Sequence, residues 1–173
     1  MATIAEGVIT MDDEKAGRIK SAVQHAFEHT IPFNRVLGLS VDSLDADAPR
    51  LRFDMRPELV GNPVRQILHG GVISATLDVV GGLAVTLALA AKLTLAANKA
   101  DEIGTDDSSA APPFPNIGTI DLRIDYLRPG RGQYFVATGR VVRLGGRVAV
   151  VHSELVNDAD EQIATGAAAY MVG

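Results

Sequence analysis

An isolated carboxylate, Asp78, lies inside an otherwise apolar run that covers residues 70–91. Burying a charged carboxylate among aliphatic side chains is costly, because desolvation disfavours its ionised form. Such a residue is kept either for a structural hydrogen bond, for example to Ser74 or to a neighbouring chain, or for chemistry. In a catalytic role it would activate a water molecule as a general base or attack a carbonyl carbon itself. The residues leave these alternatives open.

Two glycines after a histidine, His69-Gly70-Gly71, open the same run. Backbone N–H groups at the start of a helix lack intrahelical partners and favour negative charge. The amides of Gly70 and Gly71 are therefore candidates for stabilising an oxyanion, an effect of about 3–4 kcal/mol per donor in other enzymes. His69 either acts as a general base or shapes the turn, and we favour the second role because Asp78 already supplies a base.

Composition excludes several classes of function. Of the 173 residues, 47% are hydrophobic and 21% are charged, which is typical of one folded domain. The net charge of −5 argues against a nucleic-acid partner, and the lack of cysteine excludes disulfides and thiolate sites. His25 and His29 lie one helical turn apart with no third ligand nearby in sequence, so we predict no metal site. The first 14 residues do not resemble a signal peptide, and we expect a cytoplasmic protein.

The run 70–91 is long enough to cross a membrane. We nevertheless predict no membrane span, because the run contains Asp78, several glycine, serine and threonine residues, and no aromatic belt. A helix that is apolar on all sides is also expected in the core of a soluble domain.

Hydrophobic periodicity predicts one amphipathic helix, one long buried helix and six strands. Gly145-Gly146 is typical of a two-residue hairpin turn, and consecutive strands of this kind form antiparallel sheets. We therefore predict an α+β fold in which an antiparallel sheet curls around the buried helix. The expected elements are an N-terminal helix at 12–30 that Pro32 ends, strands at 36–45 and 50–56, a loop at 57–68, the buried helix at 70–91, a loop insertion at 96–116, and strands at 117–127, 134–144, 147–156 and 162–172.

This order of elements, with Asp78 nine residues after His69, resembles the hotdog-fold thioesterases, and in particular the PaaI-like acyl-CoA thioesterases and their YigI-type members. The resemblance covers residues 31–173, which it implies form one hotdog domain after an N-terminal extension and helix at 1–30. Its motifs lie at 32–38, 61–63, 69–78 and 118–130.

The resemblance implies a role for each matching residue. Asp78 matches the family's general base or nucleophile, and Gly70 matches the glycine whose amide polarises the thioester carbonyl. His69 matches the histidine that orients this turn, and Thr119 matches a hydroxyl residue on a strand across the dimer interface. Asn62 resembles an asparagine that holds the carbonyl or the attacking water, although it lies one residue further from His69 than the family pattern places it.

The function that follows is hydrolysis of acyl-CoA to a free carboxylic acid and coenzyme A, without a cofactor. Gly71 is expected to contact the substrate, and Arg128, Arg131 and Arg147 are candidates to bind the phosphates of coenzyme A. A homodimer or homotetramer is expected, since an open sheet edge pairs with its copy. The sequence leaves open a 3-hydroxyacyl-thioester hydratase or dehydratase and a non-catalytic acyl-CoA binding protein. It also leaves open acyl-carrier-protein substrates and the acyl-chain length.

Overall fold

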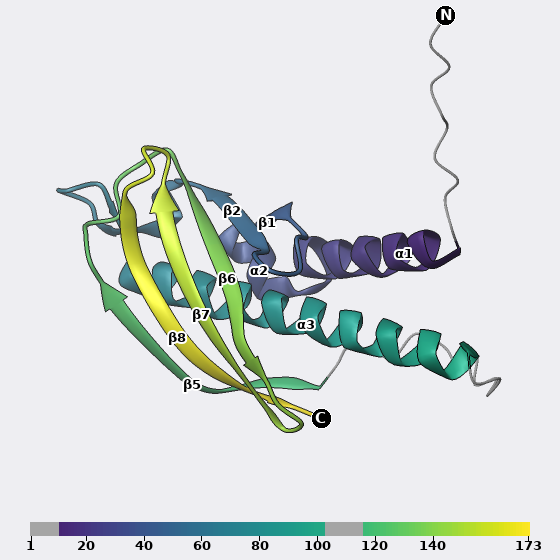
Figure 1. Cartoon of the computed structure of the whole chain (residues 1–173). Coiled ribbons are helices and arrows are strands. Elements are labelled where there is room, and N and C mark those ends of the chain that lie inside the picture. The colour runs from purple at the N-terminus through teal and green to yellow at the C-terminus, as the bar shows by residue number, and fades with distance from the viewer. Residues whose placement is uncertain (1–10, 103–115) are drawn as a thin grey trace, which may run out of the picture.

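A computed structural model of the chain describes residues 11–102 and 116–173, and a long helix laid across one face of an antiparallel sheet dominates it (Figure 1). Helix α3 (Gly70–Glu102) packs on a six-stranded sheet with the order β1-β2-β6-β7-β8-β5. This is the predicted α+β arrangement. The strands are β1 (Ser40–Ser43), β2 (Arg50–Asp54), β5 (Ile117–Tyr126), β6 (Tyr134–Leu144), β7 (Val148–Asn157) and β8 (Gln162–Val172).

Small residues of the sheet allow α3 to lie close to it. Gly139 on β6 faces the helix, and a Cβ atom there would lie 2.7 Å from the carbonyl oxygen of Val80. Leu77, Val80 and Leu83 of the helix are fully buried in this contact. The close approach places the first part of α3, including the turn that carries Asp78, directly against the sheet.

Between Gly70 and Leu95, helix α3 is long and apolar enough to cross a membrane, but 56% of this apolar segment is buried inside the molecule. Its threonines are also satisfied locally, because Thr76 and Thr86 donate hydrogen bonds to the carbonyls of Val72 and Gly82. The helix is therefore the core helix of the sheet. It continues to Glu102, so the expected loop at 96–116 was wrong in its first part, and residues 103–115 lie outside the described residues.

The structure corrects the prediction of a strand at 36–45. A short helix, α2 (Pro32–Leu37), precedes the strand, which covers only Ser40–Ser43. Pro32 does end the N-terminal helical segment, because the residue before a proline avoids the helical conformation. It also begins α2, since proline is favoured in the first turn of a helix. Gly38, with φ of 71°, ends α2 in the left-handed conformation.

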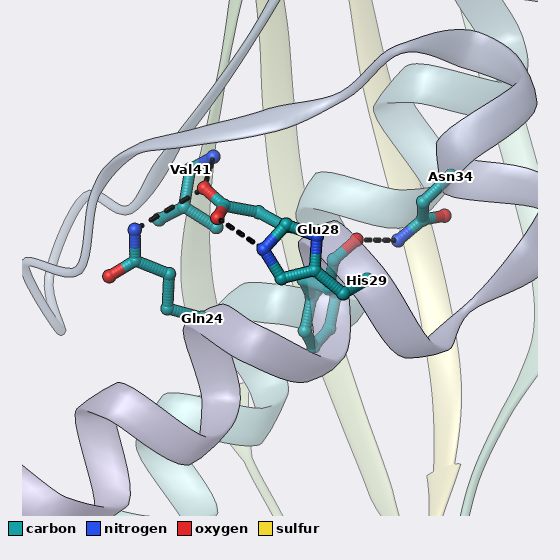
Figure 2. Close-up of polar contacts among 6 residues, drawn as sticks. Gln24, Glu28, His29, Asn34 and Val41 are labelled. Atoms are coloured by element: carbon teal, nitrogen blue, oxygen red, sulfur yellow. Dashed lines mark hydrogen bonds and ion pairs between the residues drawn. The ribbon is translucent and has the colours of Figure 1, made fainter.

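The N-terminal helical segment contacts one edge of the sheet. Helix α1 (Met11–His25) continues into a π-helical turn, η1 (Ala26–Thr30), in agreement with the helix predicted at 12–30. Glu28 in this turn accepts a 2.8 Å hydrogen bond from the backbone N–H of Val41 on edge strand β1 (Figure 2). The buried Asn34 of α2 donates to the carbonyl of Phe27 and fastens the π-helical turn from its other side (Figure 2).

The expected loop at 57–68 has more structure than was predicted. A 3₁₀ turn, η2 (Pro57–Leu59), leads into a small hairpin of β3 (Val60–Asn62) and β4 (Ile67–Leu68). This hairpin runs directly into His69 and the start of α3, so it determines where the glycine turn lies.

Candidate active site

The carboxylate of Asp78 is half-buried on α3 and is held by two hydroxyl groups. The Thr119 hydroxyl donates to Asp78 Oδ1 at 2.8 Å. The Tyr170 hydroxyl lies 3.2 Å from the same Oδ1 and 2.8 Å from the backbone carbonyl oxygen of Asp78. Among the described residues, Oδ2 of this carboxylate has no hydrogen-bond donor. The arrangement therefore restrains one carboxylate oxygen and leaves the other available.

Strand pairing explains why both hydroxyls reach one oxygen. Thr119 on β5 and Tyr170 on β8 are direct partners in the antiparallel ladder. Directly opposed residues project from the same face of a sheet, with Cβ atoms about 5 Å apart. The register is interrupted between Thr119 and Asp121, so the bulge begins at the residue that contacts Asp78.

Tyr170 is a site residue that the sequence analysis missed. It is 1% exposed, and its pKa is raised well above the usual range by burial first and by the neighbouring Asp78 carboxylate second. The phenol therefore stays protonated and acts as a donor. Its position could have been found, because alternation along β8 puts Tyr170 on the same face as Ala168 and Val172, and a buried tyrosine hydroxyl needs a partner.

The glycine turn at the start of α3 is organised around His69. The backbone N–H of His69 donates to the carbonyl of Leu59 at 2.8 Å, and its Nδ1 accepts the N–H of Gly71 at 2.9 Å. The Gly71 amide is thus engaged within the turn. The Gly70 amide finds no acceptor in the part of the chain that the structure describes. Of the two amides, Gly70 is the one free to meet a substrate oxygen.

Tyr126, at the end of β5, holds the glycine turn from the sheet side. Its hydroxyl donates to the carbonyl oxygen of Gly70 at 3.1 Å, and its ring lies against the Gly70 Cα. The side chain is 55% exposed. Strand β5 therefore contacts both halves of the site, through Thr119 at Asp78 and through Tyr126 at Gly70.

Asn62 belongs to the glycine turn rather than to the carboxylate. Its side-chain oxygen accepts the backbone N–H groups of Val64 and Arg65 at 3.1 and 3.0 Å and so shapes the β3–β4 turn. Next to it, Gly61 lies against His69, where a Cβ atom would come within 2.6 Å of the His69 Cα. Asn62 thus fixes the hairpin that supports His69.

The predicted phosphate-binding arginines lie on the loop beside the same turn. Gly130 in this loop accepts the N–H of Leu68 at 2.9 Å, one residue before His69. Arg128 donates to the carbonyl of Gln162 at 2.9 Å, and both Arg128 and Arg131 are exposed. Arg147 lies elsewhere, in the hairpin between β6 and β7.

The residues described in 11–102 and 116–173 form no cluster of three metal-ligating side chains. His25 and His29 contact each other edge to face, with ring centroids 5.1 Å apart. Both histidines are exposed on the N-terminal helical segment.

The two halves of the site are separated along α3. Gly70 and Asp78 are eight residues apart in one helix, which corresponds to about 12 Å along its axis. A thioester carbonyl and its attacking water need an oxyanion donor and a base that each lie within about 3 Å of the reacting group. The Gly70 amide and the Asp78 carboxylate of one chain are too far apart to act on the same carbonyl.

Comparison with known proteins defines the class of protein that this fold and site represent. The family model described as "Thioesterase superfamily" matches residues 65–164. The chain belongs to this superfamily, and the predicted membership and hotdog fold are confirmed.

Individual relatives agree with this assignment. The medium/long-chain acyl-CoA thioesterase YigI of Escherichia coli K12 is 41% identical over 151 residues, which cover 87% of this chain and 92% of the relative. A crystal structure from Shewanella oneidensis, described as related to the thioesterase superfamily, has 38% identity and a TM-score of 0.74 over 92% of this chain and 98% of its own. The E. coli PaaI protein, at 18% identity, shares the fold with a TM-score of 0.68 over 90% and 94% of the two chains.

Proposed function

We propose that this protein hydrolyses medium- and long-chain acyl-CoA thioesters to the free acid and coenzyme A, with Asp78 as the catalytic carboxylate. The observation that carries the proposal is the half-buried Asp78, whose Oδ1 is restrained by hydroxyls and whose Oδ2 is available. The substrate class and chain length are supported by the printed activity of YigI, which is 41% identical over most of both chains.

In the proposed reaction, Asp78 takes a proton from water as the water oxygen attacks the thioester carbonyl carbon. The Gly70 amide of a second copy of the chain, at the positive end of that copy's α3 dipole, stabilises the resulting oxyanion. The C–S bond then breaks, the thiolate of coenzyme A leaves, and the proton returns from Asp78 to it. Direct attack by Asp78 would instead give an anhydride that water hydrolyses to the same products.

The remaining predicted residues receive supporting roles in this proposal. His69 orients the glycine turn by accepting the Gly71 amide. Asn62 positions the same turn, and its side-chain N–H₂ group is assigned to the carbonyl or the water. Arg128 and Arg131 form charge-assisted hydrogen bonds with the phosphates of coenzyme A, because the exposed loop that carries them adjoins the turn. We also expect the protein to be cytoplasmic.

The separation of about 12 Å between Gly70 and Asp78 supports a site shared by two copies of the chain. Strand β5 is the edge through which we propose that they pair, since it ends the sheet with exposed Ile120 at 59% and carries Thr119. At the opposite edge, the backbone N–H of Val41 on β1 already donates to Glu28. A two-fold axis beside β5 would bring the Gly70 of one copy toward the Asp78 of the other and create two equivalent sites.

The test of the reaction is a panel of acyl-CoA substrates of increasing chain length, with released thiol measured for the parent, Asp78→Ala and a control, Asp47→Ala. Asp47 is an exposed carboxylate in the loop between β1 and β2, and its substitution should leave kcat unchanged. We expect thiol release that increases from short to medium and long chains and that is lost in Asp78→Ala. Thiol release retained by Asp78→Ala, or binding of acyl-CoA without thiol release by the parent, would overturn the proposal.

A mixing experiment tests the shared site. Gly70→Pro removes the proposed oxyanion donor at a helix start, where proline is tolerated. Asp78→Ala and Gly70→Pro are each expected to be inactive. In an equilibrated equal mixture, half of the dimers would contain one chain of each variant. Each mixed dimer has one intact site, formed by Gly70 of the first variant and Asp78 of the second. Activity should therefore return to about a quarter of the parent value. An inactive mixture that contains mixed dimers would place both residues in one chain's site.

A further inference from the structure

We propose that Tyr170 is a positioning residue of the thioesterase reaction and that, with Thr119, it reserves Oδ2 of Asp78 as the atom that accepts the proton from water or attacks the carbonyl. The inference rests on the proposed function, since it assigns roles within the same site. Its experiment is chosen so that it can fail while Asp78 remains essential.

The geometry of the hydroxyl groups carries the first step of the argument. The two hydroxyls approach the same oxygen, Oδ1, at 2.8 and 3.2 Å. The single Tyr170 proton is shared between Oδ1 and the backbone carbonyl oxygen of Asp78, which lies closer at 2.8 Å, so this hydroxyl contacts both the side chain and the backbone of that residue. A carboxylate held through one oxygen cannot rotate to exchange its two oxygens without breaking these bonds. The oxygen that meets the substrate is therefore defined before the substrate binds.

Burial carries the second step. The Tyr170 ring is packed in the cluster formed by Ala84, Val85, Val151 and Ala168, and it is 1% exposed. A tyrosine fixed in this way has little rotational freedom, and its hydroxyl has a constant position relative to α3. Burial and the adjacent carboxylate raise its pKa, so the hydroxyl keeps its proton at neutral pH.

Gly81 carries the third step, because it makes room for this hydroxyl. A Cβ atom at Gly81 would overlap the Tyr170 hydroxyl oxygen and lie 2.9 Å from the ring carbon Cζ. Glycine in the middle of a helix is destabilising relative to alanine. Its presence three residues after Asp78 is explained if the space it leaves is needed for the hydroxyl.

Tyr170→Phe removes only the hydroxyl and is the principal test. We expect kcat to fall about tenfold or more, as for loss of a hydrogen bond to a charged group, with a smaller change in KM. The acidic limb of the kcat–pH profile should move to higher pH, because the ionised carboxylate loses a donor that favours it. A merely structural tyrosine would change the melting temperature without moving this limb.

The control is Tyr134→Phe. The Tyr134 ring on β6 stacks against Arg52 of the neighbouring strand β2, whereas Thr119 and Tyr170 lie on β5 and β8 at the other end of the sheet. The control variant should leave both kcat and the pH profile unchanged. Thermal unfolding of each variant establishes that the comparison is made on folded protein.

Gly81→Ala provides a second, independent test, because it keeps the Tyr170 hydroxyl but displaces it. It should lower kcat, and adding Tyr170→Phe to it should recover part of its loss, since the phenyl ring lacks the overlapping oxygen. Gly17→Ala, in an exposed part of α1 with open space around it, is the control for the same substitution in a helix.

The outcomes separate this inference from the proposed function. If Asp78→Ala is inactive while folded Tyr170→Phe keeps the parent kcat and pH profile, the positioning role of Tyr170 is wrong and the reaction stands. If the loss of kcat in the double variant Gly81→Ala/Tyr170→Phe equals the combined losses of the two single variants, Gly81 does not serve to make room for the Tyr170 hydroxyl. If Asp78→Ala is active, the proposed function itself is wrong.

Discussion

The two halves of the site are fastened to the sheet by tyrosines in contrasting environments. Tyr170 donates to the backbone of Asp78 from inside the core, whereas Tyr126 donates to the backbone of Gly70 from the surface. The first side chain is 1% exposed and the second is 55% exposed. The half-buried carboxylate is thus fastened to the core by a buried side chain, while the glycine turn is held by a side chain at the surface.

This contrast predicts different consequences for perturbing the two halves. Changes near Asp78 should affect the chemical step, because the group is already fixed in the free protein. Changes near Gly70 should affect binding and the chemical step together, because the turn is the part of the site that we propose meets the substrate at the molecular surface.

The largest effect is expected from Asp78→Asn, which keeps the size and one oxygen of the side chain but cannot accept a proton. We expect kcat to fall about 1,000-fold, within the range for loss of a general base. Unfolding should change little, since Thr119 and Tyr170 can still donate to the amide oxygen. Steady-state thiol release and a melting curve measure the two quantities. A loss of kcat below tenfold would contradict the assignment.

Gly70→Pro should have the next largest effect. Removing one oxyanion donor lowers kcat about 100-fold in other enzymes. Because proline suits the first turn of a helix, the melting temperature should be retained. Gly70→Ala keeps the amide and has ordinary contacts with the Tyr126 ring at 3.5 Å, so it serves as the control and should retain most of the activity. Equal losses in both variants would mean that the backbone N–H is not the donor.

Thr119→Val replaces the hydroxyl that donates to Asp78 Oδ1 with a methyl group of similar size. The expected loss in kcat is about tenfold, because Tyr170 still restrains the carboxylate. Thr119→Ser restores the hydroxyl and should recover activity. A valine variant with parent kcat and a serine variant with reduced kcat would show that the methyl group, rather than the hydroxyl, matters.

Tyr126→Phe should have the smallest effect, a few-fold increase in KM with kcat nearly constant. The lost hydrogen bond is exposed, so water can replace the donor to the Gly70 carbonyl. Compared with Tyr170→Phe under identical conditions, this variant measures the contrast between the two tyrosines directly. A fall in kcat as large as that of Tyr170→Phe would remove the distinction drawn above.

The elements with clear periodicity were predictable from the sequence. The late strands alternate in hydrophobicity, and β6 and β8 have the bounds expected for them. The helix α3 was predicted from its long apolar run, but its end was not, because the mixed polar and apolar residues after Ala91 extend a helix as readily as they form a loop. Helix α2 was missed because the β-branched Val36 favours a strand, and Pro32 and Gly38 outweigh this preference by starting and ending a helix around it.

Asp78 and the glycine turn were also recognisable, since an isolated acid in an apolar run and paired glycines are local signals. Tyr170 was not, because its role depends on the pairing of β5 with β8 and on the space beside Gly81. Those relations join residues far apart in the chain. The use of the Gly71 amide by His69 was likewise invisible, because it depends on the side-chain conformation of the histidine.

The hydrogen bond from Val41 to Glu28 bears on how many copies of the chain can join through their sheet edges. A sheet with two open edges can add further molecules at both ends and so risks forming fibres. Strand β1 is short, and its Val41 N–H already donates to Glu28, so in the proposed pairing β5 rather than β1 is the edge offered to a partner. Association along the strands would then stop after one partner had joined, which favours a small closed assembly over a polymer.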